Sequence, residues 1–193
     1  LWPALIAIVY ALLGDQDRKV RLLLCVIGAL TCVLVYCFSR DLFGKRPALF
    51  AGLLAAIYPY LYIYDGWLYS ESLYTFLLLA FCYTIFRIQR KPHWSLMVLG
   101  GVLIALASLT RPNGLIILAL FIVWTLFLAW RKLLAWHVTL QSILIITTVS
   151  VLLIAPWTVR NYQVTHSLLP IADGDWKVLI GAYNNDIIQR PDY

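Results

Sequence analysis

Six long apolar runs, separated by short polar connections, limit what this 193-residue chain can fold into. They cover residues 20–42, 47–64, 70–87, 94–109, 113–130 and 134–155. An α-helix that crosses a bilayer needs about 20 apolar residues, within a range of about 17–25, and only the fourth run is slightly short. The chain is 63% hydrophobic and 12% charged, whereas soluble domains are about half apolar and a quarter charged. Because so short a chain has no core that could bury these runs, we predict that they lie in lipid.

A shorter apolar run, residues 1–13, precedes the six and stops at Gly14 and Asp15. Thirteen residues are too few to cross a bilayer, so this run is either the end of a span that starts upstream or a helix at the interface. The predicted fold class is an all-α membrane protein with about six transmembrane helices plus this interfacial or partial helix. We expect residues 1–156 to form the multi-span domain, with its N-terminal part missing, and residues 157–193 to form a polar segment outside the membrane.

Basic residues are concentrated on one predicted side of the membrane. Three short loops and helix ends there carry eight of the 15 bases beside a single acid, Asp41. Because cytoplasmic loops are enriched in Lys and Arg close to the helix ends, we place this side in the cytoplasm of a cell (inner or plasma) membrane. The net charge of +6 is then explained by topology, and we expect no nucleic-acid partner. The eight bases are Arg40, Lys45, Arg46, Arg87, Arg90, Lys91, Arg131 and Lys132.

The first candidate site lies in the outward-facing connection before the third run, YDGWLYSES at residues 64–72. Glu71 opens that run, where unpaired backbone N–H groups and the helix dipole favour a carboxylate. Glu71 is therefore a candidate catalytic residue, and Asp65 is a second one. The alternatives are a simple capping role for Glu71, with Ser70 as the N-cap, and a turn at Asp65-Gly66.

Two further outward-facing connections carry arginines that could bind phosphate. Arg111 lies between two apolar runs, where it is costly unless it reaches water or an anion, and it precedes a helix N-terminus. Arg160 and Asn161 follow Pro156, which we expect to end the sixth helix. The alternatives are a snorkelling arginine at position 111 and an interfacial anchor at positions 160 and 161.

Other catalytic patterns are absent from the sequence. No Walker loop, G-x-G-x-x-G, H-E-x-x-H or G-x-S-x-G occurs, so neither a nucleotide-driven pump nor a common hydrolase has support. The four cysteines, Cys25, Cys32, Cys37 and Cys82, lie within apolar runs and form no C-x-x-C pattern.

Four segments, in register with the runs, resemble the family 39 type of membrane glycosyltransferases with the C fold. This group includes the protein O-mannosyltransferases and the lipid A aminoarabinose transferase. Each segment alone has low specificity for the family, but the four together form a more specific pattern that extends over nearly all of the chain. They are LFGKR at residues 42–46, LYSESL at 68–73, LTRPNG at 109–114 and PWTVRNY at 156–162.

The resemblance implies transfer of a sugar from a polyprenyl-phosphate donor to a lipid, glycan or protein acceptor outside the cytoplasm. It matches Glu71 to an acidic position that lines the active site, Arg111 to a basic position at the outer end of a span, and Arg160 to the neighbourhood of the donor phosphate. The family's first acidic loop would precede Leu1, so we expect the fragment alone to be inactive. Members of this fold differ in their use of metal, so a divalent ion is left open and no other cofactor is expected.

Two alternatives to an enzyme are also consistent with the sequence. A transporter or flippase for lipid-linked sugars would use the same basic residues for binding, and it predicts helices broken in matching pairs near the middle of the membrane. Pro59 and Gly100-Gly101 are the candidate interruptions. A non-catalytic membrane subunit would make Glu71 and Arg111 dispensable.

Overall fold

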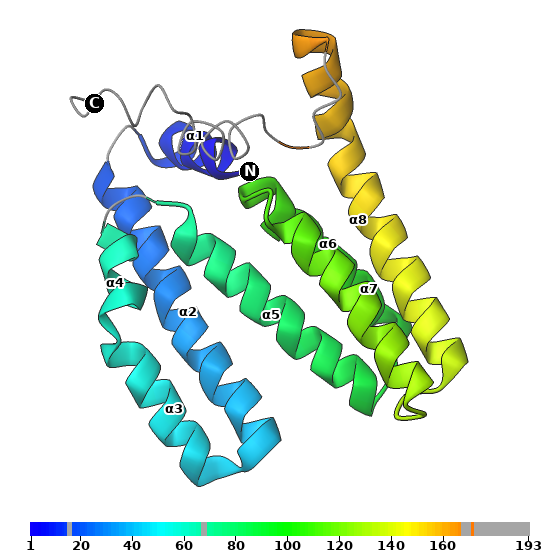
Figure 1. Ribbon diagram of the computed structural model, residues 1–193. Coiled ribbons are helices and arrows are strands. Elements are labelled where there is room, and N and C mark those ends of the chain that lie inside the picture. The colour runs from blue at the N-terminus through cyan, green and yellow to red at the C-terminus, as the bar shows by residue number, and fades with distance from the viewer. Residues whose placement is uncertain (15–16, 67–68, 167–170, 172–193) are drawn as a thin grey trace, which may run out of the picture.

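The computed structural model describes residues 1–14, 17–66, 69–166 and 171, and for residues 13, 62, 64–66 and 165 it describes the backbone alone. In these ranges the chain is built from helices, joined by turns and short connections (Figure 1). The helices are α1 (Trp2–Leu13), α2 (Asp17–Phe43), α3 (Lys45–Ile57), α4 (Pro59–Gly66), α5 (Glu71–Arg90), α6 (Trp94–Thr110), α7 (Gly114–Trp130) and α8 (Trp136–Thr165).

The helix lengths confirm the predicted all-α membrane fold. By length and composition, α2, α5 and α8 can each cross a bilayer. The apolar helices α6 and α7 have 17 residues each, which is at the lower limit of about 17 for a span. The short helix α1 lies across the other helix axes (Figure 1), as the interfacial alternative for residues 1–13 requires.

The second predicted run is divided into two helices. It breaks at Tyr58, whose φ of −74° and ψ of 115° are extended, and α4 starts at Pro59. The physical reason is steric, because the proline ring disfavours helical geometry in the residue before it. Gly100 and Gly101, the other candidate interruption, lie inside the continuous helix α6.

The sixth helix is longer than predicted, and the expectation that Pro156 ends it is wrong. Helix α8 continues through Pro156 to Thr165, and it ends at His166, whose φ of 52° is left-handed. A proline inside a helix removes one backbone N–H donor, and its ring displaces the carbonyl four residues earlier. The helix can continue if the remaining backbone hydrogen bonds are kept. Arg160 and Asn161 therefore lie on the last turns of α8.

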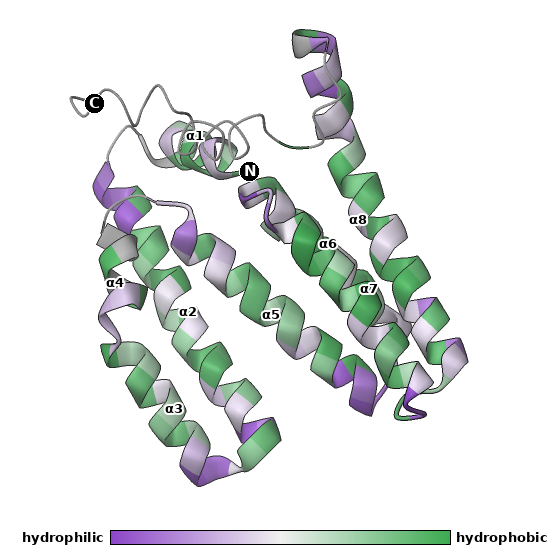
Figure 2. Ribbon diagram, viewed as in Figure 1, coloured by the Kyte–Doolittle hydropathy of each residue, from purple (hydrophilic) through white to green (hydrophobic). Residues whose placement is uncertain are grey.

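From α2 onwards the chain passes up and down in turn, with α3 and α4 forming one pass together, so that the polar connections gather at two ends with apolar helix between them (Figures 1 and 2). One end, which we call the Glu71 end, holds α1, the starts of α2, α5 and α7, and the ends of α6 and α8. The other, which we call the basic end, holds the α2–α3 turn, the end of α5 and the α7–α8 turn. All eight of the bases grouped above belong to these basic-end segments.

Helix α6 packs closely against α5 and α8, and this packing holds the Glu71 end together. At Gly101 the backbones of α6 and α8 approach closely. A Cβ at this position would lie 2.7 Å from the Cβ of Val149 and 2.9 Å from the carbonyl oxygen of Ile146. The Ser150 hydroxyl donates to the carbonyl oxygen of Gly101 at 3.1 Å. Small residues and a hydroxyl at the contact are typical of helix pairs that associate within lipid.

We predict that single cysteines at positions 65 and 91 are labelled from opposite sides of the membrane. Position 65 belongs to α4 near the Glu71 end, and Lys91 follows α5 at the basic end. The measurement is labelling with an impermeant maleimide in sealed, oriented vesicles, in a background without the four native cysteines. Labelling of both positions from one side would contradict the arrangement.

Candidate active site

Glu71 and Arg111 are 40 positions apart in the sequence, and the fold brings them into direct contact. Arg111 Nη1 donates to Glu71 Oε1 at 2.8 Å. The side chains are 40% (Arg111) and 30% (Glu71) exposed, so the pair lies at a partly open position where α5 starts and α6 ends. A charge-assisted hydrogen bond of this length orients both groups.

Arg111 is held in place by the tight turn between α6 and α7. Its N–H donates to the carbonyl oxygen of Ala107 at 2.9 Å, and its own carbonyl oxygen accepts from the Gly114 N–H at 3.0 Å. A Cβ on Gly114 would lie 2.6 Å from the backbone of Ser108. Glycine at position 114 therefore lets α7 start directly against α6, and this geometry directs Arg111 towards α5.

Glu71 lies in the first turn of α5, but its carboxylate does more than cap the helix. Ser70 occupies the N-cap position and makes no side-chain capping hydrogen bond. Of the two carboxylate oxygens, Oε1 accepts from Arg111, while Oε2 is buried and has no hydrogen-bond partner in the part of the chain that the structure describes. A buried acceptor left unpaired calls for a partner, such as an ordered water or a substrate hydroxyl, or for a catalytic role.

Tyr74 is a neighbour of this pair that sequence reasoning missed. It lies three residues after Glu71, on the same face of α5, and its side chain is half-buried. Its spacing of three residues from Glu71, which was already a candidate, could have identified it from the sequence.

Helix α1 starts beside the same end of α6. The nitrogen of Leu1 donates to the carbonyl oxygen of Leu109 at 2.7 Å.

In the part of the chain that the structure describes, Arg160 and Asn161 make contacts with Trp157 and Ile171. The Arg160 guanidinium lies 5.0 Å from the ring centroid of Trp157. Asn161 Nδ2 donates to the carbonyl oxygen of Ile171 at 3.0 Å, and Trp157 Nε1 donates to the same oxygen at 3.1 Å. The last turns of α8 stand apart from the start of α5 (Figure 1).

Asp65, the other acidic candidate, lies at the end of α4, and its side chain is outside the described residues. Within the described ranges, no three His, Cys, Asp or Glu side chains lie together as ligands of one metal ion would. The divalent ion left open by the sequence therefore has no assigned ligands in these ranges.

The family model described as dolichyl-phosphate-mannose-protein mannosyltransferase matches residues 1–159. The chain belongs to this family. It is accordingly a membrane glycosyltransferase of the mannosyltransferase type, which confirms the resemblance inferred from the four sequence segments. Neither the curated proteins nor the solved structures yielded a match. The matched residues of this mannosyltransferase family member include both Glu71 and Arg111.

For this family member we predict measurable coupling between Glu71 and Arg111 in a double-mutant cycle of Glu71→Gln and Arg111→Gln. Because both side chains are partly exposed, the expected coupling free energy is only about 0.5–1 kcal/mol. Thermal unfolding in detergent measures it. The matched control cycle combines Glu71→Gln with Arg160→Gln, which should be additive; equal coupling in both cycles would contradict the assigned contact.

Proposed function

We propose that this protein transfers a sugar from a polyprenyl-phosphate donor to a hydroxyl group of an acceptor at the outer face of the membrane. The acceptor is a lipid, a glycan or a protein. In this proposal the basic end faces the cytoplasm, as the density of Lys and Arg in its short loops favours. The Glu71 end then faces outward, and the lipid-linked donor enters it from within the bilayer.

The unpaired carboxylate oxygen of Glu71 carries the proposal. Oε2 is buried and unpartnered in the described part of the chain, while Oε1 is fixed by Arg111. An acceptor hydroxyl that donates to Oε2 would satisfy the buried oxygen and would be oriented by it. Glu71 would then take the hydroxyl proton as the acceptor oxygen attacks the anomeric carbon, which is the role of a general base.

Arg111 would act on the leaving group of the same reaction. As the new glycosidic bond forms, the bond between the anomeric carbon and the phosphate oxygen breaks, and polyprenyl phosphate leaves with additional negative charge. A guanidinium has five N–H donors, and Arg111 uses one on Glu71. Its remaining donors can stabilise the developing charge on phosphate in a partly dry site.

Arg160, Asn161 and Asp65 have secondary places in this proposal. Arg160 and Asn161 lie on the last turns of α8 at the same end of the bundle, where they would contact the donor phosphate as the lipid approaches. Asp65 belongs to α4, close in sequence to Glu71, and its catalytic role stays a prediction.

The transporter alternative has less support than the enzyme. It calls for matching breaks in two halves, and in the described helices the break at Tyr58-Pro59 has no counterpart in α6 or α8, which are continuous. The family to which the chain belongs also makes bonds rather than moving lipids. A non-catalytic subunit would make Glu71 and Arg111 dispensable, which the substitutions below test directly.

For the full-length protein, we predict that Glu71→Gln and Arg111→Ala each lower sugar transfer while the protein still inserts and accumulates. Loss of a general base typically costs about 10²–10⁴ in rate, and loss of one electrostatic stabiliser of a developing charge about 10²–10³. The measurement is transfer of labelled mannose from a synthetic mannosyl-phosphate polyprenol to acceptors in isolated membranes containing the protein.

The matched control is Arg131→Ala, which removes an exposed arginine at the basic end and should leave the rate unchanged. Wild-type transfer by both the Glu71 and the Arg111 variants would mean that the two residues only cap and anchor their helices. A donor carrying the sugar on a nucleotide, if accepted equally well, would contradict the proposed lipid-phosphate donor.

A further inference from the structure

An apolar groove lies between α2, α5 and α7, away from the Glu71–Arg111 pair. Its volume of about 340 Å³ falls within the range of roughly 300–1,000 Å³ for ligand pockets. The helix α5 contributes half of the lining residues, and Gln89 is the most polar of them. The groove is lined by Phe38 of α2, Phe81, Cys82 and Gln89 of α5, and Phe121 and Trp124 of α7, with neighbouring apolar side chains.

One end of the groove meets a cation at the basic end of the bundle. Gln89 and Arg90 form the last turn of α5. The Arg90 guanidinium lies 4.4 Å from the ring centroid of Phe86, which itself lines the groove. An apolar slot that ends beside a positive charge is complementary to a molecule with a hydrocarbon chain and an anionic head.

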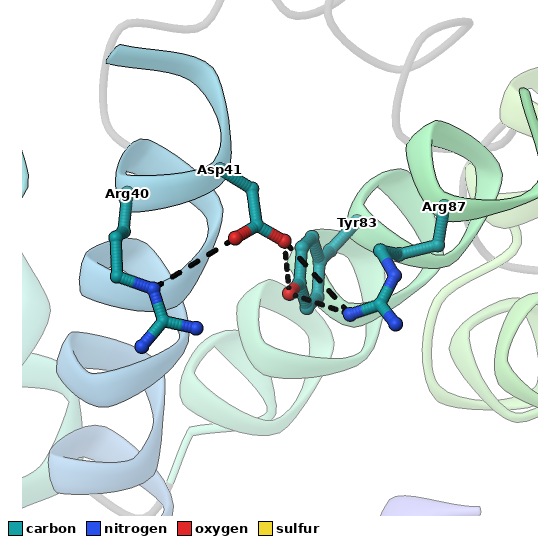
Figure 3. A network of polar contacts seen from close by, with 4 residues as sticks. All are labelled: Arg40, Asp41, Tyr83 and Arg87. Carbon is teal, nitrogen blue, oxygen red and sulfur yellow. Dashed lines mark hydrogen bonds and ion pairs between the residues drawn. The ribbon is translucent and has the colours of Figure 1, made fainter. Parts of the chain in front are cut away.

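Two neighbouring arginines, Arg40 and Arg87, form ion pairs with Asp41 at this end. Asp41 lies 3.8 Å from both Arg40 and Arg87, and the Tyr83 hydroxyl donates to it at 2.7 Å (Figure 3). Arg87 also donates to the Tyr83 oxygen at 3.2 Å. Arg90 has no carboxylate partner among the described residues, so its charge is available to an external anion.

The same network fixes the wall of the groove. The ring of Phe38 lies 5.4 Å from the rings of both Tyr83 and Phe86, centroid to centroid. Asp41 and Tyr83 therefore tie α2 to α5 beside Phe38, which lines the groove.

From this geometry we infer that the groove binds one anionic phospholipid from the leaflet at the basic end. Its acyl chain lies along Phe81, Phe121 and Trp124, and its phosphate lies against Arg90 and Gln89. Basic pockets between transmembrane helices favour anionic over zwitterionic headgroups, because each nearby base adds electrostatic attraction. This site is at the opposite end of the bundle from the proposed reaction, so it does not depend on the proposed function.

The test is native mass spectrometry of the purified protein in detergent, titrated with phosphatidylglycerol or with phosphatidylcholine of the same acyl chains. One phosphatidylglycerol should bind tightly, at least about fivefold more tightly than phosphatidylcholine. Arg90→Gln should remove that preference. Arg46→Gln, which removes an exposed base on α3 at the same end, should keep it. Equal binding of the two lipids to the wild-type protein would overturn the inference.

A second pair of variants tests the groove independently of the charge. Cys82→Phe fills the groove, whereas Cys25→Phe adds the same ring to an exposed position on α2. The first should abolish the tight phosphatidylglycerol adduct, and the second should retain it. Retention of the phosphatidylglycerol adduct in Cys82→Phe would overturn the proposed site. A tight adduct with polyprenyl phosphate that phosphatidylglycerol cannot displace would also overturn it. So would a dimer whose interface covers the groove.

Discussion

A helix within a bilayer must satisfy its backbone N–H and C=O groups internally, because lipid offers them no partner. Charged side chains are likewise costly at the centre of a bilayer, and in the described part of the chain they lie near the ends of the helices. The Glu71–Arg111 pair lies where α5 starts and α6 ends, and the Asp41 network lies where α2 and α5 end. The chemistry of the protein is therefore placed at two separate ends, with apolar helix between them.

The Glu71 end combines features that are costly unless they are used. An arginine and a glutamate lie at the edge of the apolar region, and one oxygen of the glutamate is buried without a partner among the described residues. Because both side chains are partly exposed, the ion pair adds only modestly to stability. The pair is held by a glycine-dependent turn at position 114, and we propose that it is kept for the sugar transfer proposed above.

The sequence was sufficient to predict the fold class, because the length of the apolar runs and their polar boundaries follow directly from bilayer thickness. It also identified Glu71 and Arg111 separately, from their positions beside helix termini. It could not show that they touch, since their contact depends on how α5 packs on α6. The expectation that Pro156 ends a helix failed because a proline costs only local hydrogen bonds, and the packing of α8 on α6 outweighs them. Tyr74 was missed because a tyrosine within an apolar run has the pattern of a core residue.

The claim that Glu71 and Arg111 form a reactive pair, and not merely a stabilising one, is tested most directly by exchanging their charges. In the variant Glu71→Arg with Arg111→Glu, the ion pair can form again with its partners reversed. We predict that thermal stability recovers relative to the two single reversals, while sugar transfer stays at the level of Glu71→Gln, because the carboxylate and the guanidinium now lie on the wrong sides of the reacting atoms. Transfer at a rate close to that of the wild type would contradict the account, since it would show that the pair serves only to join α5 to α6.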